Sequence, residues 1–207
     1  DLINQFLKDS CLLLIDVQKG VDVLSHWGGE NGRRNNLEAE SNMLALLSEW
    51  RQAELPVAWT LHNSLEAASP LKLSEPGGEL KPGFEIGSND IVVKKDVNSG
   101  FVGTSLEILL RRAGIQRLVV VGFFTNFCVE TTIRMSGNLG FDTYLVPDCC
   151  ATTNRVGPDG TDYDPDLVHS LTVANLHGEF CTALKISQAL SLVTDDLTDA
   201  DRCQGNE

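Results

Sequence analysis

Apolar runs and amphipathic segments alternate along the chain, and this alternation predicts the fold. Short, nearly continuous apolar runs are typical of buried parallel strands, and they occupy 11–17, 55–61, 91–93, 117–122, 142–146 and 180–186. Segments with helical character lie between most of them, at 37–53, 104–112, 128–139 and 164–177, and a last amphipathic segment follows residue 186. Strands that alternate with helices predict an α/β domain with a mainly parallel sheet covered on both faces.

Three polar stretches rich in glycine, proline or charge connect these elements, at 19–36, 63–90 and 152–163. Loops of this length inside compact domains are usually functional or disordered, and we expect the shape of any pocket to depend on them. The 207 residues fit one domain, 1–207, with a core over about 11–190. From about residue 194 the chain is acidic and polar, and we expect a frayed tail over 194–207.

Composition narrows the class of protein. The formal net charge of −13 argues against nucleic acid and against anionic membrane surfaces as partners, and the apolar runs are too short to span a bilayer. The six cysteines include no C-x-x-C pair, so we expect no disulfide scaffold, no zinc site and a reducing, cytoplasmic compartment. No signal peptide is visible, and a start at Asp1 without methionine is compatible with removal of a leader.

Three reactive side chains follow three of the predicted strands. Asp16 follows the first strand, Lys94 or Lys95 the third, and Cys128 the fourth. The carboxyl ends of parallel strands meet at one edge of a sheet, where α/β proteins bind ligands, so these residues should lie together. The lysine and the start of a helix should lower the thiol pKa and favour a thiolate. The carboxylate can accept the thiol proton and return it to a leaving amine, while backbone N–H groups stabilise an oxyanion.

Four sequence blocks carry a family resemblance. They are Leu13–Gln18, Lys95–Thr104, Gly122–Thr132 (followed by Gly140-Phe141) and Val146–Ala151. In this order and spacing the chain resembles the isochorismatase-like cysteine hydrolases, which include nicotinamidases and N-carbamoylsarcosine amidases. The resemblance implies a Rossmann-like, three-layer α/β/α sandwich with a parallel sheet of six strands. It also implies a homo-oligomer, either dimer or tetramer.

The resemblance implies a catalytic triad of Asp16, Lys95 and Cys128. Lys95 is preferred to Lys94 because the family lysine lies six residues before the phenylalanine that corresponds to Phe101. It further implies a cis peptide bond between Phe123 and Phe124, with the N–H groups of Phe124 and Cys128 directed at the oxyanion.

Four side chains are candidates for substrate binding: Gln18, Trp27, Phe101 and Phe124. Gln18 either polarises the substrate or bonds to backbone, and Trp27 forms either a pocket wall or a surface anchor. Phe101 and Phe124 flank the matched blocks, which favours pocket lining over plain core packing.

Two departures from the family pattern decide the expected chemistry. Metal-dependent nicotinamidases carry several histidines after the second strand, whereas this chain has His62 alone there, so we expect no metal and no cofactor. True isochorismatases hydrolyse a vinyl ether and lack the cysteine, whereas Cys128 is present. We therefore predict a metal-independent cysteine hydrolase (amidase) that cleaves an amide or ureide C–N bond of a small molecule through a Cys128 thioester. The alternatives are vinyl ether hydrolysis with Asp16 as the acid, and a catalytically silent protein that binds a small molecule or a partner.

Overall fold

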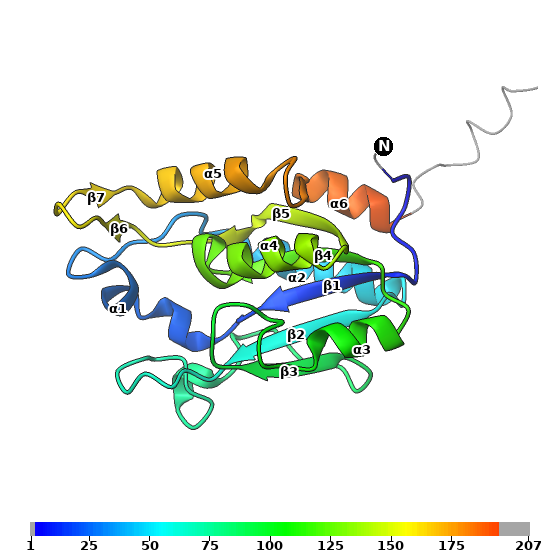
Figure 1. Ribbon diagram of the computed structural model, residues 1–207, viewed down its shortest axis with the longest axis horizontal. Coiled ribbons are helices and arrows are strands. Elements are labelled where there is room, and N and C mark those ends of the chain that lie inside the picture. The colour runs from blue at the N-terminus through cyan, green and yellow to red at the C-terminus, as the bar shows by residue number, and fades with distance from the viewer. Residues whose placement is uncertain (1–2, 195–207) are drawn as a thin grey trace, which may run out of the picture.

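A parallel sheet of six strands forms the centre of the computed structural model, which describes residues 3–194 (Figure 1). The strands lie in the order β3-β2-β1-β4-β5-β8. They are β1 Ser10–Ile15, β2 Val57–His62, β3 Ile91–Lys95, β4 Arg117–Phe123, β5 Asp142–Ala151 and β8 Thr182–Ala183. The order reverses between β1 and β4, and the carboxyl side of such a switch point is where α/β sheets place their ligands.

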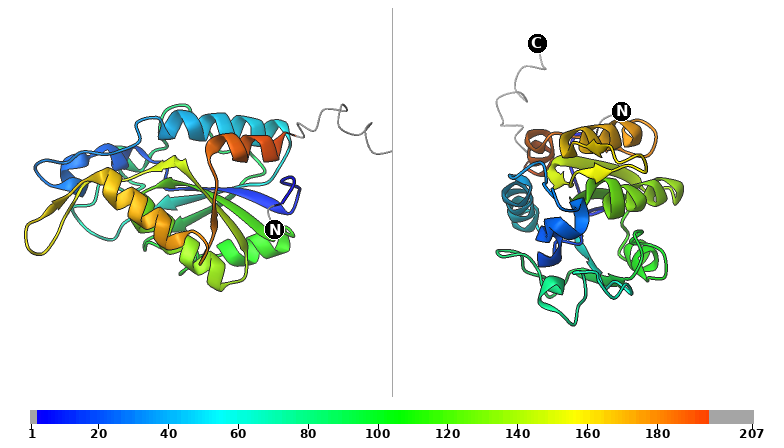
Figure 2. Two further views of the ribbon diagram at one scale, coloured as in Figure 1. Left: turned by 90° about the horizontal axis from the view of Figure 1, so that it is seen from above. Right: turned by 90° about the vertical axis from the view of Figure 1, so that its left-hand side faces the viewer.

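Helices cover both faces of the sheet, as Figure 2 shows. One face carries α2 Ala39–Gln52 and α6 Ile186–Val193, and the other carries α3 Leu106–Arg112, α4 Glu130–Asn138 and α5 Pro165–Leu176. Shorter elements are α1 Leu24–Gly28, 3₁₀ turns at Lys19–Asp22 and Pro76–Gly78, a π-helical turn at Thr125–Val129, and an antiparallel pair, β6 Arg155–Val156 and β7 Asp162–Tyr163. The predicted three-layer α/β/α sandwich is confirmed.

The alternation of side chains along β1 explains why both faces are covered. Leu12 and Leu14 pack in the core on the α2 side, whereas Cys11, Leu13 and Ile15 pack in the core on the α3 side. All five are fully buried. A strand that is apolar at every position can be stable only between two apolar layers, so this run dictates the sandwich.

Several element boundaries differ from the sequence prediction, among them the strand predicted at 142–146, which continues as β5 to Ala151. The strand predicted at 180–186 shortens to β8, because the chain turns into α6, where the Ile186 N–H donates to Asp148 Oδ2 at 2.7 Å. The polar stretch 152–163 contains the β6–β7 pair. The predicted start of α5 is confirmed, since Asp164 Oδ1 accepts the Asp166 N–H at 2.9 Å with Pro165 in the first turn.

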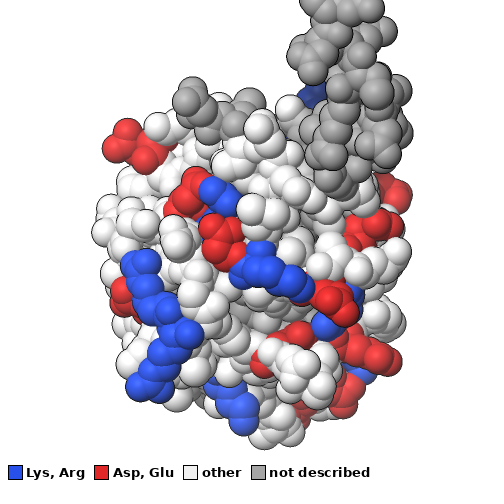
Figure 3. Space-filling model, turned by 90° about the vertical axis from the view of Figure 1, so that its right-hand side faces the viewer, with Lys and Arg blue, Asp and Glu red and all other residues white. Residues whose placement is uncertain are grey.

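Basic and acidic side chains are interspersed on the surface at the amino ends of the strands (Figure 3). The charge of −13 is therefore not gathered into one acidic patch on that face. None of the helices within residues 3–194 combines the length and apolar character needed to cross a membrane. The predicted frayed tail, beyond Thr194, lies outside the described residues.

Candidate active site

Three of the predicted site residues meet at the carboxyl edge of the sheet. Asp16 directly follows β1, Lys95 is the last residue of β3, and Cys128 lies in the π-helical turn Thr125–Val129 after β4. Strand β1 is adjacent to β4, whereas β2 separates β1 from β3. Neighbouring strands lie about 4.8 Å apart, so a side chain as long as lysine is needed to reach Asp16 across β2.

Asp16 and Lys95 form a buried ion pair. Lys95 Nζ lies 2.7 Å from Asp16 Oδ2, and the two side chains are 0% and 1% exposed. Thr60 Oγ1 donates to the other carboxylate oxygen, Oδ1, at 2.6 Å. Burial alone would lower the pKa of Lys95, but the Asp16 carboxylate, joined by Cys128 whenever its thiol is ionised, outweighs burial and raises that pKa. Lys95 is therefore a permanent cation, and Thr60 fixes the orientation of the carboxylate.

His62 completes the contacts of Lys95. Lys95 Nζ lies 2.8 Å from His62 Nδ1 and donates to the Val97 carbonyl at 3.1 Å. An ammonium group has three N–H donors and no acceptor, so these two bonds and the bond to Asp16 use all of them. His62 Nδ1 must therefore accept, which places the ring proton on Nε2. Burial and the Lys95 charge lower the pKa of His62, so this imidazole is neutral at pH 7.

The environment of Cys128 reverses one prediction. Cys128 is 8% exposed, and burial raises the pKa of its thiol. The Asp16 carboxylate raises it further, while Lys95 lowers it in part. The sequence predicts a depressed thiol pKa from a lysine and a helix start, and this is wrong because burial and the nearby carboxylate dominate. The sulfur also precedes the α-helix, which begins at Glu130. Cys128 thus rests as a thiol beside a carboxylate base.

The backbone before Cys128 offers N–H groups to the same region. The peptide bond between Phe123 and Phe124 is cis, as the resemblance implies. The Phe124 carbonyl accepts from the N–H groups of Phe127 and Val129 at 3.0 and 3.3 Å, which closes the turn. Within residues 3–194, no backbone carbonyl accepts a hydrogen bond from the Phe124 N–H. This amide remains available to a ligand, and its role in an oxyanion site stays a prediction.

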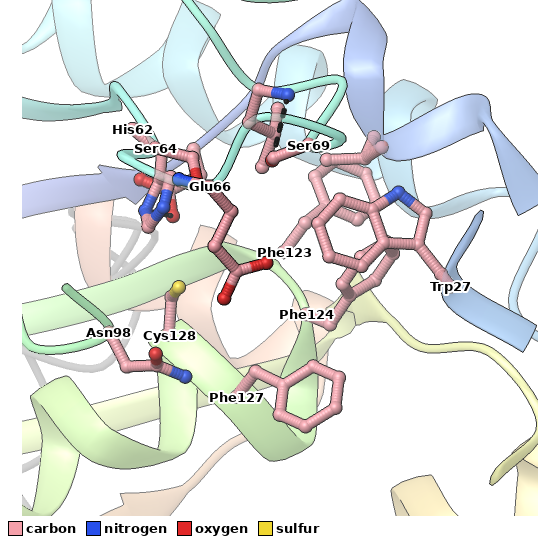
Figure 4. Close-up of a pocket in the computed structure, with 13 residues that line it drawn as sticks. Trp27, His62, Ser64, Glu66, Ser69, Asn98, Phe123, Phe124, Phe127 and Cys128 are labelled. Carbon is pink, nitrogen blue, oxygen red and sulfur yellow. Dashed lines mark hydrogen bonds and ion pairs between the residues drawn. The ribbon is translucent and has the colours of Figure 1, made fainter. Parts of the chain in front are cut away.

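A cavity of about 180 Å³ lies beside these groups (Figure 4). One end of the cavity carries Asp16, His62 and Cys128. Its remaining walls are apolar on one side and polar on the other. The apolar side is formed by Trp27, Phe123, Phe124, Phe127, Val21 and Leu71. The polar side is formed by Ser64, Glu66, Ser69 and Asn98. Such an arrangement can hold a small molecule by its apolar surface and present one polar group to the thiol.

Comparison with known proteins assigns the family. Residues 10–163 match the model of the isochorismatase domain. The chain belongs to the isochorismatase family. The isochorismatase family protein YrdC of Bacillus subtilis is 37% identical over 180 residues, which cover 87% of this chain and 94% of YrdC.

Two further relatives of this isochorismatase-family hydrolase bear on its fold and chemistry. The crystal structure of an isochorismatase-family protein from Chromobacterium violaceum superposes with a TM-score of 0.84 at 39% identity, covering 91% of this chain and 96% of that one. Ureidoacrylate amidohydrolase RutB of Acinetobacter baylyi is 42% identical over 82 residues, 38% of this chain and 34% of RutB. The family therefore includes hydrolases of C–N bonds.

Trp27 and Phe124, two predicted substrate-binding residues, both line the cavity of this isochorismatase-family chain. Their ring centroids are 5.2 Å apart, with the ring planes inclined at 65° in an edge-to-face arrangement. Trp27 Nε1 donates to the Gly20 carbonyl at 2.9 Å, which fixes the indole. The structure thus brings both rings to the cavity beside Asp16 and Cys128, as a pocket wall requires.

Gln18 and Phe101, the other two, are not among the residues that line the cavity. Gln18 Nε2 donates to the carbonyls of His62 and Gly78 at 3.0 and 3.1 Å, and its Oε1 accepts the His62 N–H at 2.8 Å. Phe101 stacks on Phe141 at 5.9 Å within the core. These are the backbone-bonding and core-packing alternatives that the sequence leaves open.

A metal ion is the other species that this cluster could hold. Single ligand atoms of Asp16, His62 and Cys128 lie within 4.8 Å of one another. However, the Lys95 ammonium already contacts Asp16 and His62 at 2.7 and 2.8 Å. A divalent cation at this position would be repelled by the buried ammonium group. It would also lack the lone pair of His62 Nδ1 as a ligand, because that lone pair accepts a hydrogen bond from Lys95. The geometry favours nucleophilic chemistry over metal binding.

Four residues at the site are not among the site residues predicted from the sequence. A hydroxyl group in the middle of a buried strand needs a hydrogen-bond partner. Thr60 is such a residue, so its position in the sequence could have indicated a polar partner nearby, although it is not part of any matched motif. His62 enters the sequence prediction only as a lone histidine that disfavours a metal site. Asn98 lies within the matched block Lys95–Thr104 without having been singled out there, and Glu66 lies in an irregular segment whose spacing gives no sign that it faces the cavity.

Proposed function

We propose that this hydrolase cleaves a C–N bond of a small amide or ureide through a covalent intermediate on Cys128. The observation that carries the proposal is the buried Asp16–Lys95 pair beside the Cys128 sulfur, with an Asp16 oxygen within 4.8 Å of Sγ. A carboxylate that lies next to a protonated thiol is a general base in reach of its proton. The amidohydrolase RutB supports C–N chemistry at the level of the family.

The steps follow from the positions of these groups. Asp16 takes the thiol proton while Sγ attacks the carbonyl carbon, and the N–H groups of Phe124 and Cys128 donate to the developing oxyanion. Asp16 then gives this proton to the leaving nitrogen as the C–N bond breaks, and a thioester remains. Water hydrolyses the thioester, with Asp16 taking one proton and the thiolate recovering it. Lys95 stays charged throughout and stabilises the ionised species.

Substitution of the nucleophile tests the proposal. Cys128→Ala should lower amide hydrolysis by at least about a thousandfold, and peptide mass spectrometry of the active protein should reveal an acyl adduct on the peptide that contains Cys128. Cys181→Ala is the matched control, because both cysteines are 8% exposed and Cys181 lies outside the cavity. Full amide turnover by Cys128→Ala would refute the proposal, and isochorismate turnover by that variant would support ether hydrolysis instead.

A further inference from the structure

Glu66 faces the cavity without a role in the proposed reaction. Figure 4 shows its carboxylate pointing into the space between Cys128 and the aromatic wall. Among the residues drawn there, none forms a hydrogen bond or an ion pair with this carboxylate. A carboxylate that faces a cavity with its acceptor oxygens free is available to a ligand.

The loop that carries Glu66 is closed by its own hydrogen bonds. The Glu66 N–H donates to Ser64 Oγ at 3.1 Å, and the Glu66 carbonyl accepts the Ser69 N–H at 3.2 Å. The Ser64 N–H donates to the Leu71 carbonyl at 2.7 Å, and the Leu71 N–H donates to Ser69 Oγ at 3.2 Å. Ser69 and Leu71 are buried and anchor the loop. The position of Glu66 is therefore built into the backbone.

The charges that line the cavity do not balance. Asp16 is paired with Lys95 at 2.7 Å, so together they contribute no net charge. Cys128 rests as a thiol because burial raises its pKa, and His62 is neutral because burial and Lys95 lower its pKa. Among the residues lining this cavity, Glu66 is thus the one negative charge without a neutralising partner.

Cations near the aromatic wall do not alter this balance inside the cavity. Arg34 and Lys81 lie 5.2 and 5.5 Å from the ring centroid of Phe123, but both are paired with Glu40, at 2.7 and 3.1 Å. Arg155 lies 4.8 Å from the ring centroid of another wall phenylalanine and donates to a backbone carbonyl. None of the three lines the cavity.

We infer that the substrate is a small amide or ureide with a positively charged group at its non-reacting end, and that Glu66 selects it. This inference rests on the proposed cysteine hydrolysis. An ammonium or guanidinium group within reach of Glu66 would form a charge-assisted hydrogen bond, while a substrate carboxylate would be repelled. Glu66 is therefore a specificity-determining residue that acts on binding, at a distance from the bond that breaks.

The selection can be measured as kcat/KM for three amides of similar size. They are 5-aminopentanamide (cationic), hexanamide (neutral) and the monoamide of glutaric acid (anionic). We expect kcat/KM to fall in that order. Glu66→Gln should reduce kcat/KM for the cationic amide by about fivefold to tenfold, mainly through KM, and leave hexanamide unchanged. Glu75→Gln removes a carboxylate from the same connecting segment, outside the cavity, and should change none of the three values.

A second measurement does not depend on turnover. It uses three methanethiosulfonates, one cationic, one neutral and one anionic, which modify Cys128. Each rate of modification is divided by the rate of the same reagent with a free thiol. The normalised rates report the charge on the path to the sulfur. Peptide mass spectrometry separates Cys128 from the other cysteines. The normalised ratio of cationic to anionic rates should exceed one and should fall about fivefold to tenfold in Glu66→Gln but not in Glu75→Gln.

The outcomes separate this inference from the proposed function. Hydrolysis that requires Cys128 but shows equal kcat/KM for the three amides, or prefers the anionic one, overturns the selection by Glu66 and leaves the proposed function intact. Hydrolysis that survives Cys128→Ala overturns the proposed function instead. A normalised rate ratio of one also contradicts the inference, because an unpaired carboxylate on the path to the sulfur would favour the cationic reagent.

Discussion

Removal of the Lys95 charge is the most direct test of the buried ion pair. Lys95→Met keeps the aliphatic chain and leaves Asp16, which is 1% exposed, without its counter-ion. Because the pair is inaccessible to water, screening does not reduce the effect. Breaking one side of a buried pair costs about 3–5 kcal/mol. In a chain of 207 residues this corresponds to a fall in Tm on the order of 10 °C.

A double-mutant cycle isolates the pair from other contacts of Lys95. Asp16→Asn and Lys95→Met should each destabilise the protein, while the double variant removes both charges and should cost less than the sum by at least about 2 kcal/mol. Urea unfolding followed by fluorescence of the buried Trp50 and Trp59 measures each free energy of unfolding. Lys8→Met, at an exposed ion pair, is the control and should leave the midpoint nearly unchanged.

Additive costs in the double variant would refute the reasoning, because they would mean that the two charges do not interact. So would a Lys95→Met midpoint equal to that of the control. Activity provides a separate reading, since all three site variants should be inactive whatever their stability. A stable double variant without activity would show that the pair is kept for chemistry and not for folding.

Three further predictions concern the surroundings of the triad. Thr60→Val removes the 2.6 Å hydrogen bond to Asp16 and should lower kcat/KM by about tenfold, whereas Thr60→Ser should retain activity. His62 has a folded-state pKa below its ordinary 6.5, so the stability it contributes above that pH is lost on acidification. A pH–rate profile should show the matching acid limb, and His62→Gln should remove it. Gly122→Ala, at a φ of 124° with a Cβ 2.2 Å from a backbone oxygen, should cost more than about 3 kcal/mol by urea unfolding, against about 1 kcal/mol for Gly114→Ala in open space.

The sequence predicts well the features that depend on the local pattern of apolar and polar residues. Unbroken apolar runs such as Leu12–Ile15 require burial on two faces, and that requirement leads to the sandwich. The motif spacing favours Lys95 over Lys94, and the geometry of the strand explains this choice. Along β3 alternate side chains face opposite ways, so Lys94 is exposed while Lys95 is 3% exposed and meets Asp16.

The features that the sequence does not predict depend on what surrounds a group in space. The pKa of Cys128 is set by burial and by a carboxylate more than a hundred positions away in the chain, so the helix end and the lysine alone predict the wrong direction. Glu66 faces the cavity from a loop closed by its own hydrogen bonds, and the tautomer of His62 follows from the number of N–H donors on the Lys95 ammonium. Neither constraint leaves a periodic signal.

A raised thiol pKa is compatible with nucleophilic catalysis because the charge of the triad is balanced. With Cys128 as a thiol, Asp16 ionised and Lys95 charged, the site is neutral before substrate binds. When the proton moves from sulfur to carboxylate during attack, Lys95 faces the negative charge in its new place, and the buried site again holds no net charge. A resting thiolate beside an ionised Asp16 would instead place two anions around one cation, at a desolvation cost that grows with burial. Burial therefore favours transfer of the proton during the attack and not before it.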